Sequence, residues 1–168
     1  MDIRVHYCGV IRMLQIYSKG CEYVIRALAR MDQNDCKEGF SVDVVCKRAR
    51  VPLWFTRKIF QTLARRGVLV ATHGPGGGYR FKKDPNRISL LSMIKAVDGE
   101  NVFQKCILGQ SKCNDQNSCS VHATWGKVRT ELISELRSTT IKQLMNQETK
   151  LHSKDRNGRK KSRRNHSN

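Results

Sequence analysis

The sequence predicts a mainly α-helical fold with one small β-hairpin and a long C-terminal helix. Apolar residues recur at helical spacing in successive segments between residues 21 and 97, and again between residues 122 and 147. Two short β-rich segments, 68–71 and 79–81, enclose a glycine-rich turn. Residues 148–168 are basic and show no periodicity, which predicts a disordered tail.

The first predicted helix covers residues 21–31. Its apolar positions follow the spacing of one helix face: Val24, Ile25, Leu28 and Met31. Residues 32–40 are polar and contain Asp, Asn and Gly, so we expect a loop there. Ser41 is a good N-cap for a second helix over 42–49, with Val44, Val45 and Ala49 directed inward.

A third helix is predicted over residues 52–66, after a tight connection at 50–51. Pro52 is tolerated in a first helical turn, and Gly67 is the expected left-handed residue that ends the helix. Its apolar stripe is Phe55, Ile59, Phe60 and Leu63. The hairpin follows, then a turn at 84–87 and a helix over 89–97 that ends at Gly99.

Two helices joined by a short turn and followed by a hairpin have the order of a winged helix-turn-helix. In that fold the second helix of the pair lies in the major groove of DNA, and the hairpin is the wing. The outward residues of this helix can donate hydrogen bonds to base edges or contact them: Trp54, Arg57, Lys58 and Gln61. In the wing, Gly76 and Gly77 permit close backbone approach, and His73 and Arg80 flank the tip.

The charge supports a polyanionic partner. The formal net charge is +18, of which residues 148–168 contribute +6. The remaining +12 belongs to residues 1–147, so the predicted folded part is itself basic and favours nucleic acid. No run approaches the length of a membrane span and residues 1–12 lack a signal-peptide core, so we expect a cytoplasmic protein without a membrane partner.

Three cysteines and a histidine occupy a polar segment between two predicted helices. Cys106, Cys113 and Cys119 have the spacing C-x6-C-x5-C, and His122 follows. Thiolates are soft ligands for iron–sulfur clusters, zinc or copper, and zinc sites usually have tighter C-x2-C pairs. The spacing therefore favours a cluster, while three incidental thiols stay possible. No carboxylate pair, Ser/His/Asp order or cofactor fingerprint indicates an enzyme.

Three segments resemble the Rrf-two family of winged-helix transcriptional regulators, which includes IscR-like and NsrR-like proteins. They are SKGCEYVIRAL, LARRGVLVATHGPGGGYRF and ISLLSMIKAVDG, within a resemblance that covers about residues 13–147. The resemblance implies a homodimeric repressor or activator of double-stranded DNA, with a dimerisation helix at 122–147. It places the cluster ligands at Cys106, Cys113 and Cys119.

For the fourth ligand the resemblance offers two residues. His122 matches the histidine of IscR-like members, and Glu22 of the partner subunit matches the carboxylate of NsrR-like members. The first favours 2Fe–2S, which we prefer, and the second is compatible with 4Fe–4S. The candidate DNA contacts also include Ser18, Lys19 and Arg26. His73 replaces the Arg that is common in the family, and residues 1–12 and the basic tail have no counterpart.

These observations divide the chain into five parts. They are an N-terminal extension (1–12), a winged helix-turn-helix domain (13–99), a cysteine-rich loop (100–121), a dimerisation helix (122–147) and a basic tail (148–168). We predict a regulator whose cluster senses redox state, nitric oxide or iron–sulfur status. One alternative is a metal-free or zinc-containing DNA-binding regulator with redox-active thiols. Another is an iron–sulfur carrier or electron-transfer protein.

Overall fold

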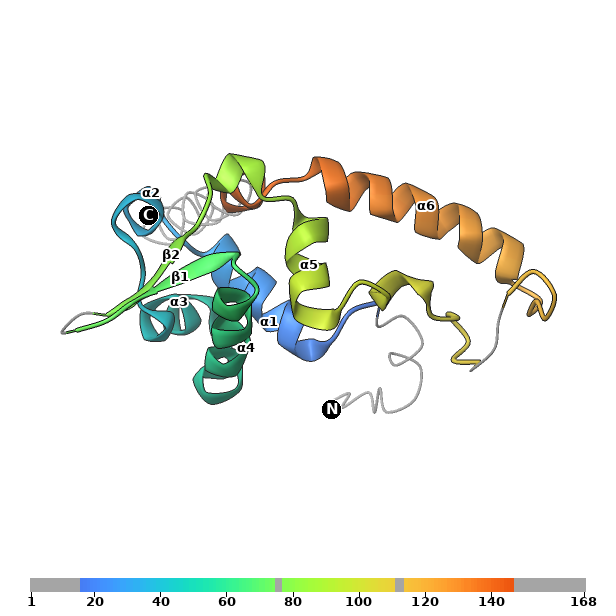
Figure 1. Cartoon of the computed structure of the whole chain (residues 1–168), viewed down its shortest axis with the longest axis horizontal. Coiled ribbons are helices and arrows are strands. Elements are labelled where there is room, and N and C mark those ends of the chain that lie inside the picture. The colour runs from blue at the N-terminus through green and yellow to red at the C-terminus, as the bar shows by residue number, and fades with distance from the viewer. Residues whose placement is uncertain (1–15, 75–76, 111–113, 147–168) are drawn as a thin grey trace, which may run out of the picture.

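The structure is a computed structural model that describes residues 16–74, 77–110 and 114–146. It confirms a mostly helical chain with one two-stranded antiparallel hairpin (Figure 1). In chain order the elements are α1 (Lys19–Ala29), α2 (Gln33–Glu38), α3 (Val42–Ala49), α4 (Leu53–Arg65), β1 (Leu69–Thr72), β2 (Gly78–Phe81), η2 (Pro85–Arg87), α5 (Leu90–Asp98), η3 (Val102–Gln104) and α6 (His122–Ser138).

The core lies where α1, α3, α4 and α5 meet. Leu28, Phe60, Leu63 and Ile94 are fully buried there. The turn between α3 and α4 is compact because Arg50 adopts the left-handed conformation (φ 52°) and the N–H of Val51 donates to the carbonyl of Cys46 over 3.1 Å. Gly67 ends α4 with a φ of 73°, as its position predicts.

The wing is anchored to the helices at its base. β1 and β2 pair from Leu69 opposite Phe81 to Thr72 opposite Gly78. On the other side of β2, Phe40 and Tyr79 exchange two backbone hydrogen bonds of 2.8 and 2.9 Å. The wing therefore leaves the domain as a supported ribbon rather than as a free loop.

The predicted loop at 32–40 contains a short helix, α2. Asp32 and Asp35 form a capping box, in which each side chain accepts a hydrogen bond from the other residue's backbone N–H. Arg48 of α3 forms ion pairs with both carboxylates. The sequence signal for this helix is the Asp-x-x-Asp spacing. Val44 was predicted to point inward, but its side chain is 44% exposed.

The predicted single helix over 122–147 is wrong: α6 ends at Ser138, and a second helical segment covers 141–146. Between them the carbonyl of Thr139 accepts from the N–H of Leu90, and the N–H of Ile141 donates to the carbonyl of Ile88, both over 2.9 Å. Thr140 then caps the second segment, because it exchanges hydrogen bonds with Gln143 in the manner of a capping box. The break turns the chain onto the core, where Ile141 and Met145 are buried.

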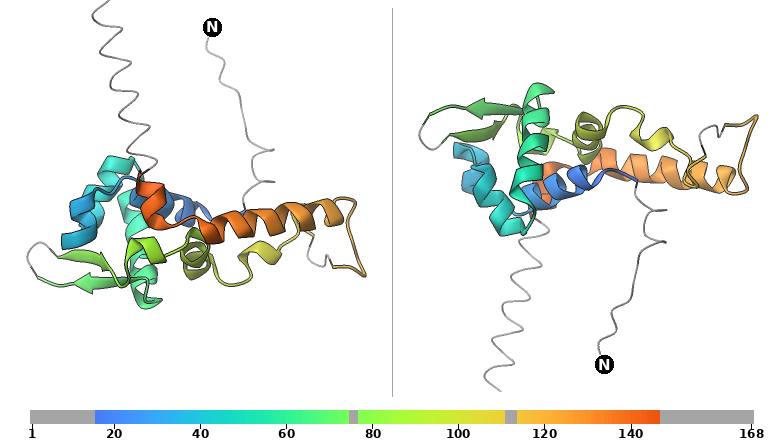
Figure 2. Two further views of the ribbon diagram at one scale, coloured as in Figure 1. Left: turned by 90° about the horizontal axis from the view of Figure 1, so that it is seen from above. Right: turned by 90° about the horizontal axis from the view of Figure 1, so that it is seen from below.

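α6 extends away from the rest of the described chain (Figures 1 and 2). None of its 17 residues is buried, although Val128, Leu132 and Leu136 give it apolar positions at helical spacing. Near its carboxyl end, α6 packs against α5. Within the described residues, no helix combines the length and the apolar character needed to cross a membrane.

Candidate nucleic-acid interface and cysteine pair

The outward face of α4 carries the predicted base-reading residues. Thr56, Phe60 and Leu63 are buried on the inner face, which leaves Trp54, Lys58 and Gln61 exposed. Trp54 is 79% exposed, an unusual value for so large an aromatic side chain. With Arg65 these exposed residues form a stripe along the helix at helical spacing. This stripe is the arrangement that a helix in the major groove requires.

Arg57, the remaining predicted residue of α4, is turned toward α3. Its guanidinium forms an ion pair with the carboxylate of Asp43, and both side chains are about half exposed. Sequence spacing does not reveal this partner, because the two residues lie on different helices. The ion pair fixes the direction of Arg57 and offsets its charge next to the stripe.

Hydrogen bonds connect the amino end of α1 to the carboxyl end of α5. The N–H and the hydroxyl of Ser18 both donate to the carboxylate of Asp98, over 2.6 Å each. Lys19 forms an ion pair with Glu22 over 2.6 Å, and Arg26 lies 3.8 Å from the other oxygen of Glu22. Glu22, the candidate ligand donated to the partner subunit, is therefore held between two of the predicted DNA contacts. Asp98 was not among the predicted site residues.

The wing presents polar groups near its tip. His73 and Arg80 are exposed, and Gly76 lies outside the described residues. A β-carbon at Gly77 would come within 2.7 Å of the carbonyl oxygen of Thr72. The tip therefore requires a glycine at that position, as the sequence predicts.

The structure brings two of the predicted metal ligands together. The sulfur atoms of Cys106 and Cys119 are 3.9 Å apart, although the residues are separated by 13 positions. Cys113 lies outside the described residues. His122 begins α6, and its Nε2 lies 3.2 Å from a carboxylate oxygen of Asp115. Within the described part of the chain, no three Cys, His, Asp or Glu side chains converge on one point.

The indole of Trp125 ties the start of α6 to the cysteine segment. Its N–H donates to the carbonyl of Lys105 over 3.2 Å, directly before Cys106. The N–H of His122 likewise donates to the carbonyl of Cys119 over 3.0 Å. The two thiols are therefore positioned by the first turn of α6, so a change at the cysteines would act directly on this helix.

The thiols of α1, α2 and α3 have a different environment. Cys21 and Cys46 are buried. Burial, reinforced by the nearby charge of Asp98, raises the pKa of the Cys21 thiol to about 12. Burial also raises the pKa of Cys46, against a hydrogen bond with Thr56 that lowers it, and it raises the pKa of half-buried Cys36. These thiols resist forming thiolates, the form that binds metal.

We expect iodoacetamide to label Cys106 and Cys119 well before Cys21 and Cys46 in metal-free protein, because alkylation needs an accessible thiolate. Labelling of Cys21 should stay slow even at about pH 10, below its raised pKa. Unfolded Cys21 has a pKa of about 8.5, so its stabilising contribution is complete below that pH and declines as the pH rises toward 12. Peptide mass spectrometry after timed labelling tests this order. Equal rates for Cys21 and Cys119 would contradict it.

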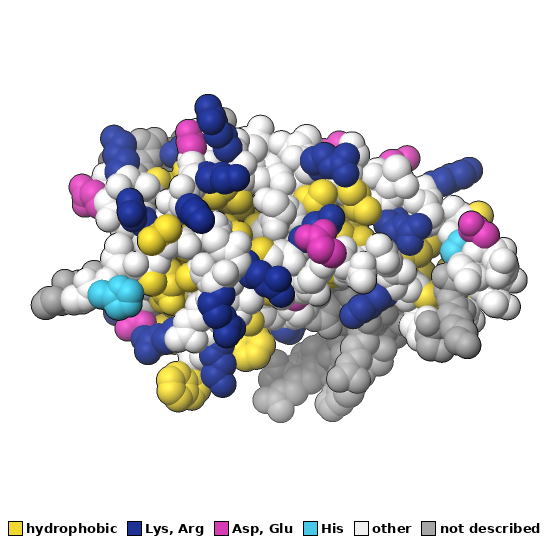
Figure 3. All heavy atoms as spheres, in the orientation of Figure 1, with side chains coloured by type: hydrophobic (Ala, Val, Ile, Leu, Met, Phe, Trp, Pro, Cys, Tyr) yellow, Lys and Arg dark blue, Asp and Glu magenta, His cyan; other side chains and the backbone are white. Residues whose placement is uncertain are grey.

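Cations dominate the face that carries α4 and α5 (Figure 3). A compact helix-turn-helix, an exposed stripe on its second helix and an anchored wing define a winged helix-turn-helix protein, a class that binds DNA. A family model described as "Rrf2: Iron-dependent Transcriptional regulator" matches residues 17–147. The chain belongs to the Rrf2 family and is a DNA-binding transcriptional regulator of that type.

Similar proteins agree with this assignment. The chain is 30% identical over 137 residues to an HTH-type transcriptional regulator of Aquifex aeolicus. The aligned region covers 80% of this chain and 94% of the relative. It is 28% identical over 143 residues to the HTH-type transcriptional regulator IscR of Cronobacter sakazakii, covering 85% and 87% of the two chains. These relatives are regulators and not enzymes.

Solved structures show the same fold. The cysteine regulator CymR of B. subtilis aligns with a TM-score of 0.59 at 17% identity, over 77% of this chain and 95% of that chain. IscR of T. potens aligns with a TM-score of 0.57 at 20% identity, over 77% and 85%.

Proposed function

We propose that this regulator is a homodimer that senses redox state, nitric oxide or iron–sulfur status through an iron–sulfur cluster. The proposed ligands are Cys106, Cys113 and Cys119, with His122 as the fourth and Glu22 of the partner subunit as the alternative. The observation that carries the proposal is the 3.9 Å separation of the Cys106 and Cys119 sulfurs. Family membership and the IscR relatives support it.

The cysteine pair fits the proposed group. Two thiolates bound at about 2.3 Å to one tetrahedral metal ion lie about 3.8 Å from each other. The observed sulfur separation agrees with this value and is far longer than the roughly 2.05 Å of a disulfide. The same pair would also suit zinc, which stays the main alternative for the metal.

The surroundings of His122 favour it as the fourth ligand. Metal-binding histidines usually have a second partner, often a carboxylate, that orients the ring. Asp115 supplies such a carboxylate at Nε2. Glu22 is instead engaged by Lys19 and Arg26 of its own helix. This comparison supports the 2Fe–2S type that a histidine ligand favours.

The exposed apolar positions of α6 support dimerisation. Leu132, Ile133 and Leu136 of α6 are only partly buried against the core, and none of its 17 residues is fully buried. A second copy would cover Val128, which is 48% exposed, and its neighbours on the same face. The proposed dimer would present two copies of α4 to successive major grooves, about 34–36 Å apart.

The described contacts offer a route between the cysteines and the DNA-binding surface. When bound, the cluster would supply reversible redox chemistry and reactivity toward oxidants. Cys106 follows α5 and η3 in the chain, and Asp98 at the end of α5 holds Ser18 at the start of α1. A shift of the cysteine segment would therefore reach Ser18 and Lys19, two predicted DNA contacts, through Asp98. The bistable element in this proposal is the position of α1 relative to α5.

Purification without oxygen, followed by visible spectroscopy with iron, sulfide and zinc analysis, tests the proposal. We expect the original protein to be coloured. The variant Cys113→Ala should lose the visible absorption and bind DNA with a changed affinity. Cys36→Ala is the control, because this thiol lies on α2 outside the cysteine segment. His122→Ala should alter the spectrum more than Glu22→Gln.

A colourless protein that takes up no iron on reconstitution would reject the cluster. One bound zinc would instead establish the zinc-containing regulator. The prediction of a cytoplasmic location stays part of this proposal.

A further inference from the structure

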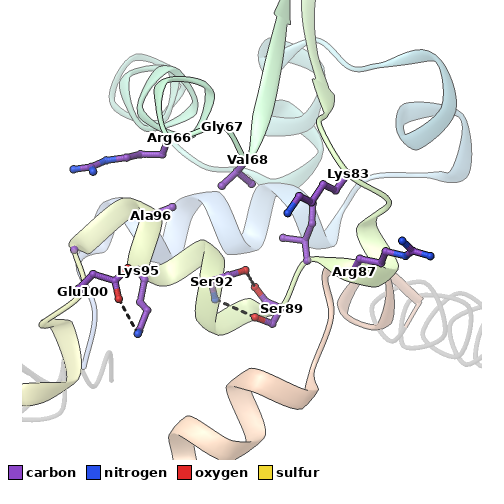
Figure 4. Close-up of a pocket in the computed structure, with 12 residues that line it drawn as sticks. Arg66, Gly67, Val68, Lys83, Arg87, Ser89, Ser92, Lys95, Ala96 and Glu100 are labelled. Atoms are coloured by element: carbon purple, nitrogen blue, oxygen red, sulfur yellow. Dashed lines mark hydrogen bonds and ion pairs between the residues drawn. The ribbon is translucent and has the colours of Figure 1, made fainter.

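A groove lies at the carboxyl end of α4, away from the Trp54 end of that helix. Its volume is about 620 Å³, and it is lined by residues from the α4–β1 turn, η2 and α5, with Lys83 after β2 (Figure 4). Val68, Ile88 and Ala96 are its apolar residues. The cations around it are Arg66, Lys83, Arg87 and Lys95.

The groove has an excess of positive charge. Lys95 forms an ion pair with Glu100 over 2.8 Å. No ion pair with a residue in the described ranges is found for Arg66, Lys83 or Arg87, and all three are exposed. The ammonium of Lys82 adds a further charge nearby, since it would lie 3.6 Å from a β-carbon at Gly67. A hollow lined by one sign of charge focuses the potential and attracts anions.

The cations are spread out rather than gathered around one point. In Figure 4, Arg66 and Arg87 extend away from each other at opposite sides of the groove, and Lys83 lies between them. A single small anion is best bound by groups that converge on it. A row of separated cations suits a ligand with repeated negative charges, such as a nucleic-acid strand.

The groove is continuous with the outward face of α4. Arg66 directly follows Arg65, the last residue of the exposed stripe that begins at Trp54. A helix of 13 residues is about 20 Å long. DNA that contacts the amino end of α4 through its bases can therefore place backbone phosphates near the other end.

We propose that this groove binds phosphates of the DNA backbone beside the base pairs that α4 contacts. The inference rests on the proposed function only in that the protein binds DNA, and it requires no cluster. Contacts of this kind fix the position and orientation of a protein on the duplex without reading sequence. Lys83 and Arg87 are the principal residues, because both are outside the helix-turn-helix and no ion pair within the described residues offsets their charge.

The double variant Lys83→Gln/Arg87→Gln in the full chain tests the proposal. Fluorescence anisotropy with a mixed-sequence duplex of about 30 base pairs, about three helical turns, gives the affinity over a range of salt concentrations. We expect binding to weaken roughly 3- to 10-fold, and the slope of log K against log salt to fall by about 2, one phosphate contact for each cation. The matched control, Lys127→Gln/Arg137→Gln, removes the same charge from α6. Its slope should stay within about 0.5 of the original.

Binding of inorganic tripolyphosphate, measured by calorimetry, separates the two sources of phosphate. If the double variant loses tripolyphosphate binding and keeps its DNA salt slope, the groove takes a free phosphate compound and the DNA assignment is overturned. If neither ligand is affected, the groove is not a phosphate site. Failure of the original protein to bind any duplex would instead reject DNA binding itself. Circular dichroism melting of each variant confirms that a loss of binding is not a loss of fold.

Discussion

Phe60→Ala is expected to destabilise the folded chain by about 3–5 kcal/mol, a large part of the stability of a domain of this size. Phe60 has no exposed surface, and its ring lies 5.6 Å from Phe40 and 6.0 Å from Tyr79 between centroids. These partners come from the segment before α3 and from the wing. The substitution therefore opens a cavity where α4, the core and the wing meet, and DNA binding should fall together with stability.

Trp54→Ala is the control on the same helix. Because Trp54 is 79% exposed, its removal should change the free energy of unfolding by no more than about 0.5 kcal/mol. DNA affinity should nevertheless fall about 10-fold, if the indole contacts base edges as proposed. Urea denaturation and anisotropy on the same samples measure both effects. Phe60→Ala with an unchanged unfolding midpoint, or Trp54→Ala with a large loss of stability, would reverse this assignment of roles.

The helices that the sequence predicts well are those with a regular apolar face. α3 has the predicted bounds, and α4 differs by one residue at each end, because Val45, Phe60 and Leu63 are buried at the expected spacing. α2 was missed because its residues are polar except Cys36 and give no apolar face, and its stability comes from a capping box and from Arg48 on another helix. The break at Thr139 was missed because apolar periodicity continues through it. Its local signal, Thr-x-x-Gln at 140–143, is visible in the sequence.

The candidate site divides in a similar way. The exposed stripe of α4 and the pairing of Cys106 with Cys119 follow from local spacing or from family resemblance. The link between Ser18 and Asp98 joins residues 80 positions apart, and the groove combines the α4–β1 turn, η2 and α5. Apolar periodicity describes one helix or strand at a time, so it cannot predict contacts between elements that are distant in the chain.

Gly78→Ala is expected to destabilise the chain by about 2–4 kcal/mol and to detach the base of the wing. A β-carbon at Gly78 would come within 2.2 Å of the carbonyl oxygen of Phe40. This oxygen belongs to the backbone, so it cannot move aside as the end of a flexible side chain does. Relief of this overlap requires separation of Phe40 from β2, which removes the paired hydrogen bonds between Phe40 and Tyr79. Hydrogen exchange of those two amides should accelerate more than exchange in α1.

Arg80→Ala separates the anchoring of the wing from its charge. Arg80 is exposed on β2, the strand that also contains Gly78. Its substitution leaves the backbone undisturbed, so the unfolding midpoint should stay nearly unchanged. DNA affinity should fall in both variants, through misplacement of the wing in Gly78→Ala and through loss of one cation in Arg80→Ala. Only Arg80→Ala should reduce the salt slope by about 1 with no change in amide exchange at Tyr79. If Gly78→Ala leaves Tyr79 as protected as before, the wing is held by its aromatic packing on Phe60, and the strand-like pairing with Phe40 contributes little.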